Sequence, residues 1–594
     1  MKRARTGIAA SLLAALIVGT VAALIAGVVG LVVADWFAGR ATQAGAGAVA
    51  RAPADDPRPN ILLLLAEDLG PRVGAYGDPV AVTPHLDQLA RDGTRYTRVF
   101  TTSGVCAPSR AGLITGVHAI STGSLHMRSS DRGYQSVPPA EVKAFPELLR
   151  AAGYATFTDF KLDYQFSGTG AGSGPFTIWD DEGFRAHWRN LPAGRPFFGL
   201  INFLETHESG VFPRPAWPRS GAHATMQLVH LWLHRGHEER VNPAEVPLPP
   251  YYPDTPLIRA DIARHYDNVH RMDERVGEIL AQLEADGLAD STVVIWSTDH
   301  GDGLPRAKRE LFDSGIHVPM IIRWPGSLRP PDAAPGSVDE RLVSFVDLAP
   351  TILALAGVDA PAWMDGRVFA GPRPAAERRY VFASKDRIDE QPDRQRSVRD
   401  ARYKYIRSYR PGTPGAVHVA WRDVQDTMRE LWDYHERGKL EGAAALWFEP
   451  RPEETLYDTA RDPHEIHDLA LDPAYDSTLL RLRGALDAWL AQRVDRGAQP
   501  EEEMIEQMWP GGEQPVTGAP RVEILGAQDA PRVRIQEATP GSSIGYRVDD
   551  GHWQLYTQAF PAAPGARIEA RAVRYGWAES PVVRAVAELG ESSR

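Results

Sequence analysis

The segment SGVCAPSRAGLITG, residues 103–116, contains Cys106, the only cysteine in this chain of 594 residues. A single thiol cannot form an internal disulfide, so Cys106 is either an inert core residue or the object of the chemistry. Arg110 follows four residues later and would place a fixed, planar cation beside the thiol. Thr115 and Gly116 are expected to shape the turn that follows. Alone, a cysteine in this setting is typical of a core, and other segments must decide between the two roles.

Three apolar runs in the chain each end in polar, titratable residues. They are NILLLLAEDLG at 60–70 with Glu67 and Asp68, PFFGLINFLETH at 196–207 with His207, and STVVIWSTDHGDG at 291–303 with Asp299 and His300. Continuous apolar runs are typical of parallel strands buried on both faces. Helical patterns at 83–93 and 259–289 lie between them. Since parallel strands end at one edge of a sheet, an α/β fold would bring these polar residues together.

CAPSR followed by LITG resembles the Cys-x-Pro-Ser-Arg and x-x-Thr-Gly signature of type I sulfatases of the alkaline phosphatase superfamily, in which the cysteine becomes formylglycine. The resemblance covers roughly residues 59 to 500 and implies an alkaline-phosphatase-like mixed sheet flanked by helices. It implies hydrolysis of a sulfate ester or sulfamate. One hydroxyl of the formylglycine hydrate attacks sulfur, and the other later expels sulfate by collapse to the aldehyde, an exit that a thiol lacks. A formylglycine-generating enzyme would be a required partner.

The same resemblance implies the roles of the site residues. A divalent cation, one calcium ion per site rather than magnesium, would be held by Glu67, Asp68, Asp299 and His300. The residues implied in catalysis are Cys106, Arg110, Lys161 and Lys308, which surround the sulfate, and His207, the general acid. Two positions depart from the family pattern. Glu67 replaces the usual aspartate, and Lys161-Leu162-Asp163 lacks the usual histidine, for which His126 and His118 are candidate replacements.

Segments at 161–164, 206–209, 300–319 and 397–409 resemble the heparan N-sulfatase-like branch of the family. The resemblance implies a sulfated carbohydrate substrate of the glycosaminoglycan type. His126, His317 and Arg387 are the candidate substrate-binding residues. His317 and Arg387 would contact an anionic sugar at the rim of the site, or act only as local salt-bridge partners.

Two other functions remain open from the sequence. Phosphodiesterases and phosphonate monoester hydrolases of the same superfamily share the Cys-x-Pro-Ser-Arg motif and the metal pair. A catalytically silent, surface-anchored glycan-binding protein would keep Cys106 as a thiol, with Glu67 and Asp163 as marks of a decayed site. A net charge of −12 and the lack of a Lys/Arg-rich stripe argue against nucleic acid as a partner.

The N-terminal region predicts export. MKRAR precedes an apolar run from Gly7 to Ala34 that contains no charge and is long enough to cross a bilayer of about 30 Å. The preceding Lys and Arg residues favour a cytoplasmic N-terminus. We predict a retained signal-anchor, a transmembrane helix within 1–38, with the catalytic domain in the periplasm or outside the cell. The alternative is a signal cleaved within 41–52, which would release a secreted protein.

Composition divides the rest of the chain into four parts. They are a linker at 39–58, a catalytic α/β domain at 59–375, a smaller α+β subdomain at 376–514 with one strand at 402–409, and a small all-β sandwich at 515–594. The run at 540–580 resembles the C-terminal domain that accompanies chitobiases and hexosaminidases. We expect its aromatic residues either to fill the core of the sandwich or to stack on sugar rings. These residues are Trp553, Tyr556, Tyr575 and Trp577.

Overall fold

The computed structural model describes residues 56, 58–212, 221–233, 239–527 and 529–588. The predicted anchor at 1–38 and almost all of the predicted linker at 39–58 lie outside the described residues. Among the helices that are described, none combines the length and the apolar composition needed to cross a membrane.

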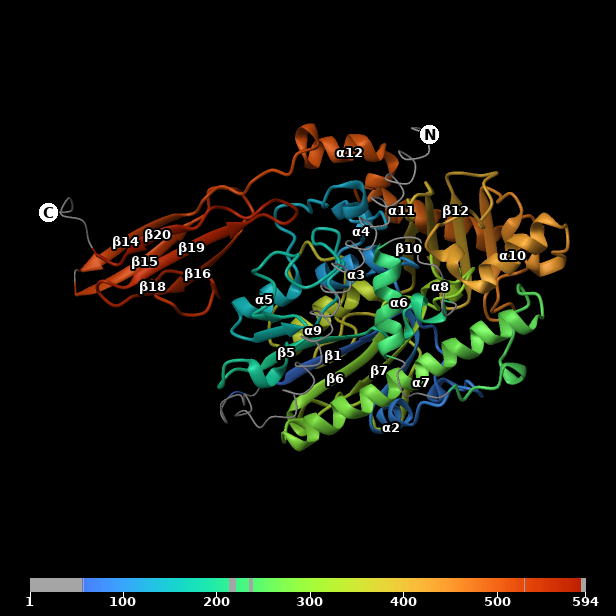
Figure 1. Ribbon diagram of the computed structural model, residues 1–594, viewed down its shortest axis with the longest axis horizontal. Helices are drawn as coiled ribbons and strands as arrows, with labels where there is room; N and C mark the ends of the chain where they lie inside the picture. Colours follow the sequence, from blue (N-terminus) through green and yellow to red (C-terminus); the bar gives the residue numbers. More distant parts are fainter. Residues whose placement is uncertain (1–55, 57, 213–220, 234–238, 528, 589–594) are drawn as a thin grey trace, which may run out of the picture.

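A nine-stranded mixed sheet forms the centre of the described chain (Figure 1). Its order is β4-β3-β5-β1-β6-β7-β2-β8, with β9 paired to β2. The strands toward the edges are short: β3 (Ala155–Thr158), β4 (Asp181–Glu182), β8 (Ser337–Asp339) and β9 (Val343–Ser344). The three predicted strands are adjacent in it: β5 (Phe197–Phe203) and β6 (Thr292–Thr298) both pair in parallel with β1 (Asn60–Ala66). Antiparallel pairing enters through β7 (His317–Arg323), which lies between β6 and β2 (Thr94–Phe100). The predicted mixed α/β sheet is confirmed.

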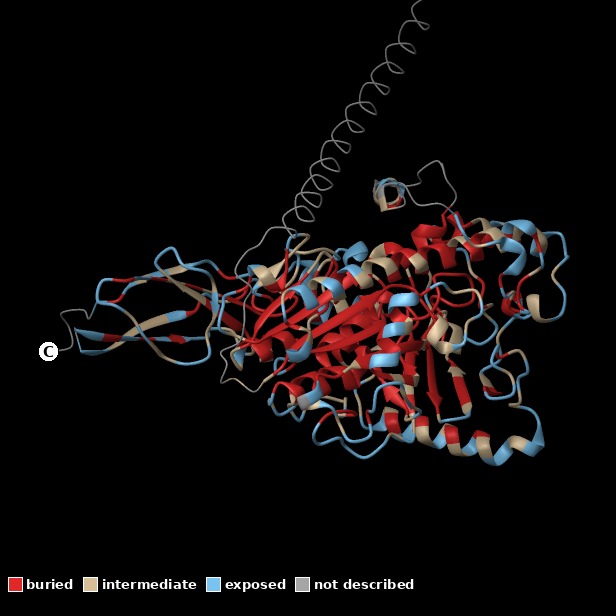
Figure 2. Ribbon diagram, turned by 90° about the horizontal axis from the view of Figure 1, so that it is seen from below, coloured by how far each residue is buried: buried red, intermediate tan, exposed pale blue. Residues whose placement is uncertain are grey.

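Helices cover both faces of this sheet, and alternate residues of β1 point to opposite faces. Leu63 and Leu65 pack with residues of α3 (Cys106–Thr115), α5 (Phe145–Ala151) and α9 (Leu348–Leu355). Leu62 and Leu64 pack with residues of α2 (Pro84–Asp92) and α7 (Pro256–Ala285), which occupy the two predicted helical segments. Figure 2 shows the central sheet as almost wholly buried, which explains why its strands are continuous apolar runs.

The smaller subdomain contains a four-stranded antiparallel sheet, where the sequence predicted one strand. Its strands, in spatial order, are β10 (Val381–Lys385), β11 (Gln395–Arg399), β12 (Tyr403–Ser408) and β13 (Glu454–Asp458). The predicted strand is β12. The helices α10 (Asp426–Glu436), α11 (Asp476–Ala491) and α12 (Glu501–Met508) belong to the same part of the chain. The other strands cannot be predicted from hydropathy because their buried residues include charged ones. Arg396, for example, is buried and paired with Asp386 and Asp495.

Two further antiparallel sheets lie at the C-terminal end, away from the central sheet (Figure 1). One contains β14 (Arg521–Ala527), β15 (Ala530–Gln536) and β18 (Phe560–Pro561). The other contains β17 (Gln554–Leu555), β16 (Ser543–Val548), β19 (Arg567–Val573) and β20 (Val583–Val586). Val533, Ile544 and Ile568 are part of the core that the two sheets share. The all-β character predicted for this region is confirmed, while the domain boundaries stay predictions.

Tyr575 joins this sandwich to the catalytic part of the molecule. Its side chain has no exposed surface and belongs to the core cluster of the central sheet, where its ring stacks on Phe166 at 5.0 Å. The Tyr575 hydroxyl donates a hydrogen bond to Glu147 Oε2 (2.8 Å), and Ser543 Oγ donates one to Glu147 Oε1 (2.6 Å). Burial and the neighbouring Glu147 raise the Tyr575 pKa well above its usual value. Tyr575 is thus a packing residue and not a platform for sugars.

We predict that Tyr575→Ala separates the sandwich from α5. Loss of a buried aromatic ring costs about 3–5 kcal/mol of unfolding free energy, so calorimetry should show a clearly lower melting temperature. Tyr575→Phe is the matched control, since it keeps the ring and loses only hydrogen bonding, at about 1 kcal/mol. Equal destabilisation by the two variants would contradict the packing role.

Candidate active site

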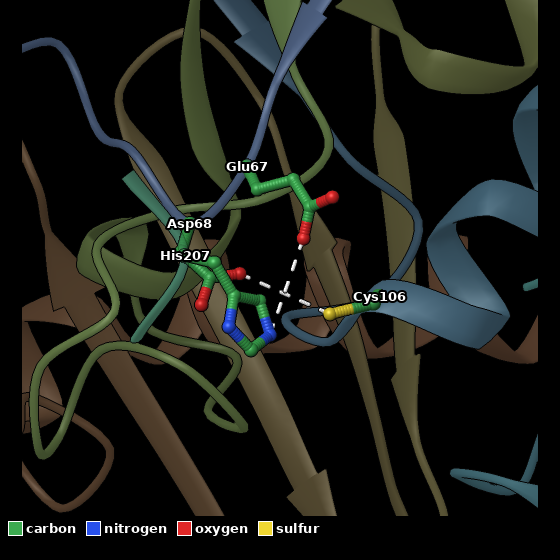
Figure 3. Close-up of side chains that lie close together, drawn as sticks. All are labelled: Glu67, Asp68, Cys106 and His207. Atoms are coloured by element: carbon green, nitrogen blue, oxygen red, sulfur yellow. Dashed lines mark hydrogen bonds and ion pairs between the residues drawn. The ribbon is translucent and has the colours of Figure 1, made fainter. Parts of the chain in front are cut away.

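Cys106 is the first residue of α3, and the residue before it, Val105, is extended. The Cys106 side chain has no exposed surface, yet its Sγ lies 3.3 Å from His300 Nε2. The same sulfur lies 3.8 Å from Asp68 Oδ1 (Figure 3). The helix ends at Gly116, whose positive φ of 70° lets its N–H bond to Gly112, as the sequence predicts for a turn. The thiol therefore lies at the N-terminus of a buried helix, next to the polar cluster.

The register of β1 and β6 brings the acidic strand ends together. Ala66 is paired with Thr298, so Glu67 and Asp68 leave the sheet next to Asp299 and His300. The Asp68 N–H donates to Asp299 Oδ1 (3.1 Å), and His300 Nε2 lies 3.0 Å from Asp68 Oδ1. His207 arrives from β5 through the 3-10 helix Leu204–Thr206. The structure thus gathers all four predicted metal ligands at one edge of the sheet.

The donor set of this cluster fits a divalent cation. Ligand atoms of Asp68, Asp299, His300 and Cys106 lie within 4.8 Å of one another, as do those of Glu67, Asp68, Cys106 and His207. Glu67 Oε1 is buried and accepts no hydrogen bond from the described residues, although Arg110 Nη2 is 3.5 Å away. Three carboxylates and one imidazole offer mainly hard oxygen ligands, which suit calcium.

Three cations lie against these carboxylates, and all three were predicted. Lys161 Nζ donates to Glu67 Oε2 (2.5 Å), and Lys308 Nζ donates to Asp68 Oδ2 (2.6 Å). Arg110 Nε donates to Asp299 Oδ2 (3.0 Å), and its Nη1 donates to Asn202 Oδ1 (2.7 Å). Each of these side chains is buried, so the cations are fixed within reach of any group that binds beside Cys106.

Burial and charge shift the pKa values of the cluster in different directions. Burial raises the pKa of Glu67, against the influence of Lys161 and Arg110. Burial would also raise the pKa of Asp68, but Lys308, His207 and His300 hold it well below its usual range. Burial would lower the pKa of His300, yet the adjacent Asp299 and Asp68 raise it to about 10. Asp68 is therefore the most firmly ionised of the carboxylates that leave β1.

His207 is backed by a chain of hydrogen bonds that the sequence did not reveal. Its Nε2 faces the cluster, 4.0 Å from Glu67 Oε2 (Figure 3), while its Nδ1 lies 2.7 Å from Ser209 Oγ. Ser209 Oγ in turn lies 2.7 Å from Nε2 of His230, which is on α6 (Gly221–Leu233). Burial, with Lys308 and Lys161, lowers the His207 pKa well below its usual value. The ring is thus held with one nitrogen toward the site.

Glu208 and Arg309 are a second pair that the sequence did not reveal. Arg309 donates from Nη1 and Nη2 to the two carboxylate oxygens of Glu208 (2.8 and 2.9 Å), and Lys308 Nζ is 3.1 Å from Glu208 Oε1. Glu208 is therefore a buried anion that helps to hold Lys308 in place. The signals available in the sequence were its position next to His207 and its place in the segment 206–209 that resembles a family branch.

The three predicted substrate-binding residues do not join this cluster. Arg387 is 4% exposed and donates to Glu501 Oε2 (2.6 Å) and to the Met127 carbonyl (2.9 Å). His317 Nε2 lies 2.8 Å from the Thr97 carbonyl, and its ring stacks on Phe100. His126 Nδ1 accepts from the Arg387 N–H (3.2 Å), and burial lowers the His126 pKa to about 4. Arg387 thus makes the local salt bridge that was the alternative for it, His317 and His126 make local hydrogen bonds, and substrate contact by any of the three stays a prediction.

The candidate replacement His118 also lies apart from the nucleophile. Its ring meets Trp489 edge-on at 5.0 Å, and its backbone N–H donates to Asp365 Oδ2 (2.9 Å). His118 is thus engaged with α11 and not with α3. Asp163 occupies the position at which the family pattern has the histidine, two residues after Lys161.

The mixed sheet, with Cys106 among the acidic strand ends, fits a hydrolase of the sulfatase class, and comparison with known proteins agrees. Residues 59–358 match the family described as Sulfatase. Residues 306–434 match the family described as N-sulphoglucosamine sulphohydrolase, C-terminal. The chain belongs to the sulfatase family and is a sulfuric ester hydrolase.

Named relatives cover most of the chain. An Ulvan-active sulfatase of Formosa agariphila is 38% identical over 558 residues, which are 89% of this chain and 91% of the relative. Human N-sulphoglucosamine sulphohydrolase is 28% identical over 474 residues, 72% of this chain and 89% of the relative. The solved structure of a 2-O GAG sulfatase, 20% identical, aligns with a TM-score of 0.50 over 74% of this chain and 93% of its own. That structural likeness concerns the fold alone.

We predict that Lys308→Ala lowers kcat/KM for 4-nitrophenyl sulfate at least a hundredfold. The buried ammonium is fixed beside Asp68 and Glu208, where a preorganised cation stabilises developing negative charge. Lys439→Ala, which removes an exposed lysine, serves as the control and should stay within twofold of wild type. A Lys308→Ala enzyme with near-normal kcat/KM and an unchanged melting temperature would remove Lys308 from the catalytic set.

Proposed function

We propose that this sulfatase hydrolyses a sulfate ester or sulfamate of a sulfated carbohydrate, with residue 106 converted from cysteine to formylglycine. The observation that carries the proposal is the position of the buried Cys106 sulfur within 4.8 Å of the ligand atoms of Asp68, Asp299 and His300. The Ulvan-active sulfatase and the N-sulphoglucosamine sulphohydrolase among the relatives support a carbohydrate substrate.

One hydroxyl of the hydrated residue 106 attacks sulfur in line with the sugar oxygen or nitrogen. Lys161, Lys308 and Arg110 neutralise charge that develops on the sulfuryl oxygens. His207 gives its proton to the leaving group, since its Nε2 faces the cluster and an anion bound there favours the protonated ring. The second hydroxyl then expels sulfate as the aldehyde re-forms, and water restores the hydrate.

The proposed cation is calcium, with Glu67, Asp68, Asp299 and His300 as its ligands. A bound divalent cation would polarise a sulfuryl oxygen and favour ionisation of the attacking hydroxyl. Glu67 has a longer side chain than the usual aspartate, and Lys161 holds its Oε2, so its Oε1 is the atom free of hydrogen bonds that would face the ion.

We also propose that the protein is exported and acts outside the cytoplasm. The apolar run from Gly7 to Ala34, with the basic residues before it, supports a membrane anchor, and release after cleavage within 41–52 is the alternative. A formylglycine-generating enzyme of the host is the partner that the nucleophile requires. An exported sulfatase would have access to extracellular polysaccharides.

The first test is mass spectrometry of the tryptic peptide VFTTSGVCAPSR, residues 99–110, from protein of the native host. We expect an aldehyde or its hydrate at position 106. The same preparation should then release sulfate from 4-nitrophenyl sulfate and from a panel of ulvan and heparan sulfate oligosaccharides, and Cys106→Ala should not. A thiol throughout, with no turnover and with sugar binding that survives Cys106→Ala, would instead identify a glycan-binding protein. Faster cleavage of a matched phosphodiester would identify a phosphodiesterase.

Removal of the cation is expected to abolish activity and to lower stability together. Glu67, Asp68 and Asp299 are buried carboxylates that lie close to one another, and a divalent ion relieves their mutual repulsion. Dialysis against a chelator should lower the melting temperature and reduce turnover of 4-nitrophenyl sulfate below a tenth. Calcium should restore both values better than magnesium. Full activity after exhaustive chelation, checked by elemental analysis, would contradict a metal-dependent site.

A further inference from the structure

Backbone conformations that L-residues rarely adopt gather around the nucleophile. Of the non-glycine residues described with positive φ, six form a connected set near the site: Asp68, Arg128, Asp163, Gln165, Arg309 and Asp389. Ser129 donates from its N–H to Gln165 Oε1 (3.0 Å), and Arg309 Nε donates to Asp389 Oδ2 (3.1 Å), which links the loops that carry them. Such strain is found at functional sites, where surrounding contacts maintain it.

Arg128 differs from the other arginines of this region because no described residue forms a hydrogen bond or an ion pair with its guanidinium. Its side chain is half-buried, and its neighbour Met127 packs with Cys106 and Ile388. Arg110, Arg309 and Arg387 are each held by a carboxylate. Within the described part of the chain, the Arg128 guanidinium makes no hydrogen bond and no ion pair; Asp163, Asp389 and Cys106 are near enough to act on it only through their charge.

Asp163 is a buried carboxylate to which none of the described side chains or backbone groups donates a hydrogen bond. It is 3% exposed, and its Oδ2 is buried without a hydrogen bond from any described residue. Its backbone N–H is engaged with the Gly168 carbonyl (3.2 Å), so the loop that follows Lys161 is fixed while the carboxylate is not. Leaving a buried acceptor without a donor costs stability unless a ligand supplies the donor.

We propose that Arg128 and Asp163 form a recognition subsite beside residue 106. Arg128 binds a second anionic group of the substrate, a carboxylate or another sulfate, and Asp163 accepts a hydrogen bond from a neighbouring hydroxyl. The inference rests on the proposed function and adds to it the class of sugar: one that carries an anionic group besides the sulfate that is cleaved. Lys161, Lys308 and Arg110 are already held by the carboxylates of the cluster, whereas the planar Arg128 fork is open to a bidentate anion.

The test compares a sulfated disaccharide that contains a uronic acid with 4-nitrophenyl sulfate, which has no second anion. Arg128→Asn is the main variant because asparagine tolerates the left-handed backbone at φ 51°. We expect the ratio of kcat/KM for the disaccharide to kcat/KM for 4-nitrophenyl sulfate to fall at least tenfold. Arg128→Lys should restore part of the ratio. Arg132→Asn removes an exposed arginine of the same segment and should leave the ratio within twofold of wild type.

Two modified disaccharides identify the anion. Both derive from a disaccharide that carries a uronic acid and a sulfate in addition to the one that is cleaved. In one, the carboxylate is reduced to a hydroxymethyl group, and in the other, the additional sulfate is absent. Removal of the group that Arg128 binds should lower the kcat/KM ratio of the wild-type protein tenfold. The same removal should cause no further loss of the ratio in Arg128→Asn.

Two results would overturn the subsite. An equal loss on both substrates in Arg128→Asn would mean that Arg128 serves the chemistry or the fold. A double variant with Asp163→Asn that recovers the wild-type ratio would mean that Arg128 only neutralises Asp163. If the wild-type protein cleaves no substrate, the proposed function fails, and the subsite is then decided by equilibrium dialysis of the disaccharide. A Kd at least tenfold higher in Arg128→Asn supports it, and an unchanged Kd overturns it.

Discussion

The molecule is organised around a cluster of buried carboxylates that must be neutralised. Glu67, Asp68 and Asp299 have no exposed surface, and removing a charge from water costs several kcal/mol unless an opposite charge lies beside it. The compensating cations come from distant segments: Arg110 from α3, Lys161 from the loop after β3, and Lys308 from the region after β6. No local segment could hold this cluster alone. The parallel register of β1 and β6 is the constraint that makes the convergence possible.

The sequence predicted the parts of the fold in which hydropathy and position agree. β1, β5 and β6 lie between helical layers, so they are apolar throughout, and their polar residues begin where the strands end. The residues predicted around Cys106 lie together in the structure, at strand ends and loops whose order in the chain the motifs indicate. β11 was not predicted, because Arg396 in it is neutralised by Asp495, a residue about a hundred positions away, and buried charge of this kind resembles an exposed strand or a loop.

Residues that position others were harder to find than the residues they position. Ser209 lies in a segment that resembles a family branch, but His230 has no motif of its own, and only the placement of α6 over the 3-10 helix Glu208–Val211 brings the two together. Conversely, Arg387 and His317 lie in segments that resemble a family branch, yet their polar atoms are engaged by Glu501 and by the Thr97 carbonyl. A motif predicts which residue is present, whereas the burial and the partner of that residue depend on segments that are far apart in the chain.

The complete burial of α3 sets an order of events during synthesis. The helix packs against α9 and the 3-10 helix Phe345–Asp347, and a Cβ at Gly116 would meet Met364 at 3.1 Å. These covering residues emerge roughly 240 positions after Cys106, which at about 5–20 residues per second corresponds to roughly 10–50 seconds. Cys106 has no exposed surface in the folded protein, so a modifying enzyme can reach it only before these residues cover it. For the proposed conversion of residue 106 to formylglycine, the rate of translation relative to the rate of modification would then set the fraction of molecules that are modified.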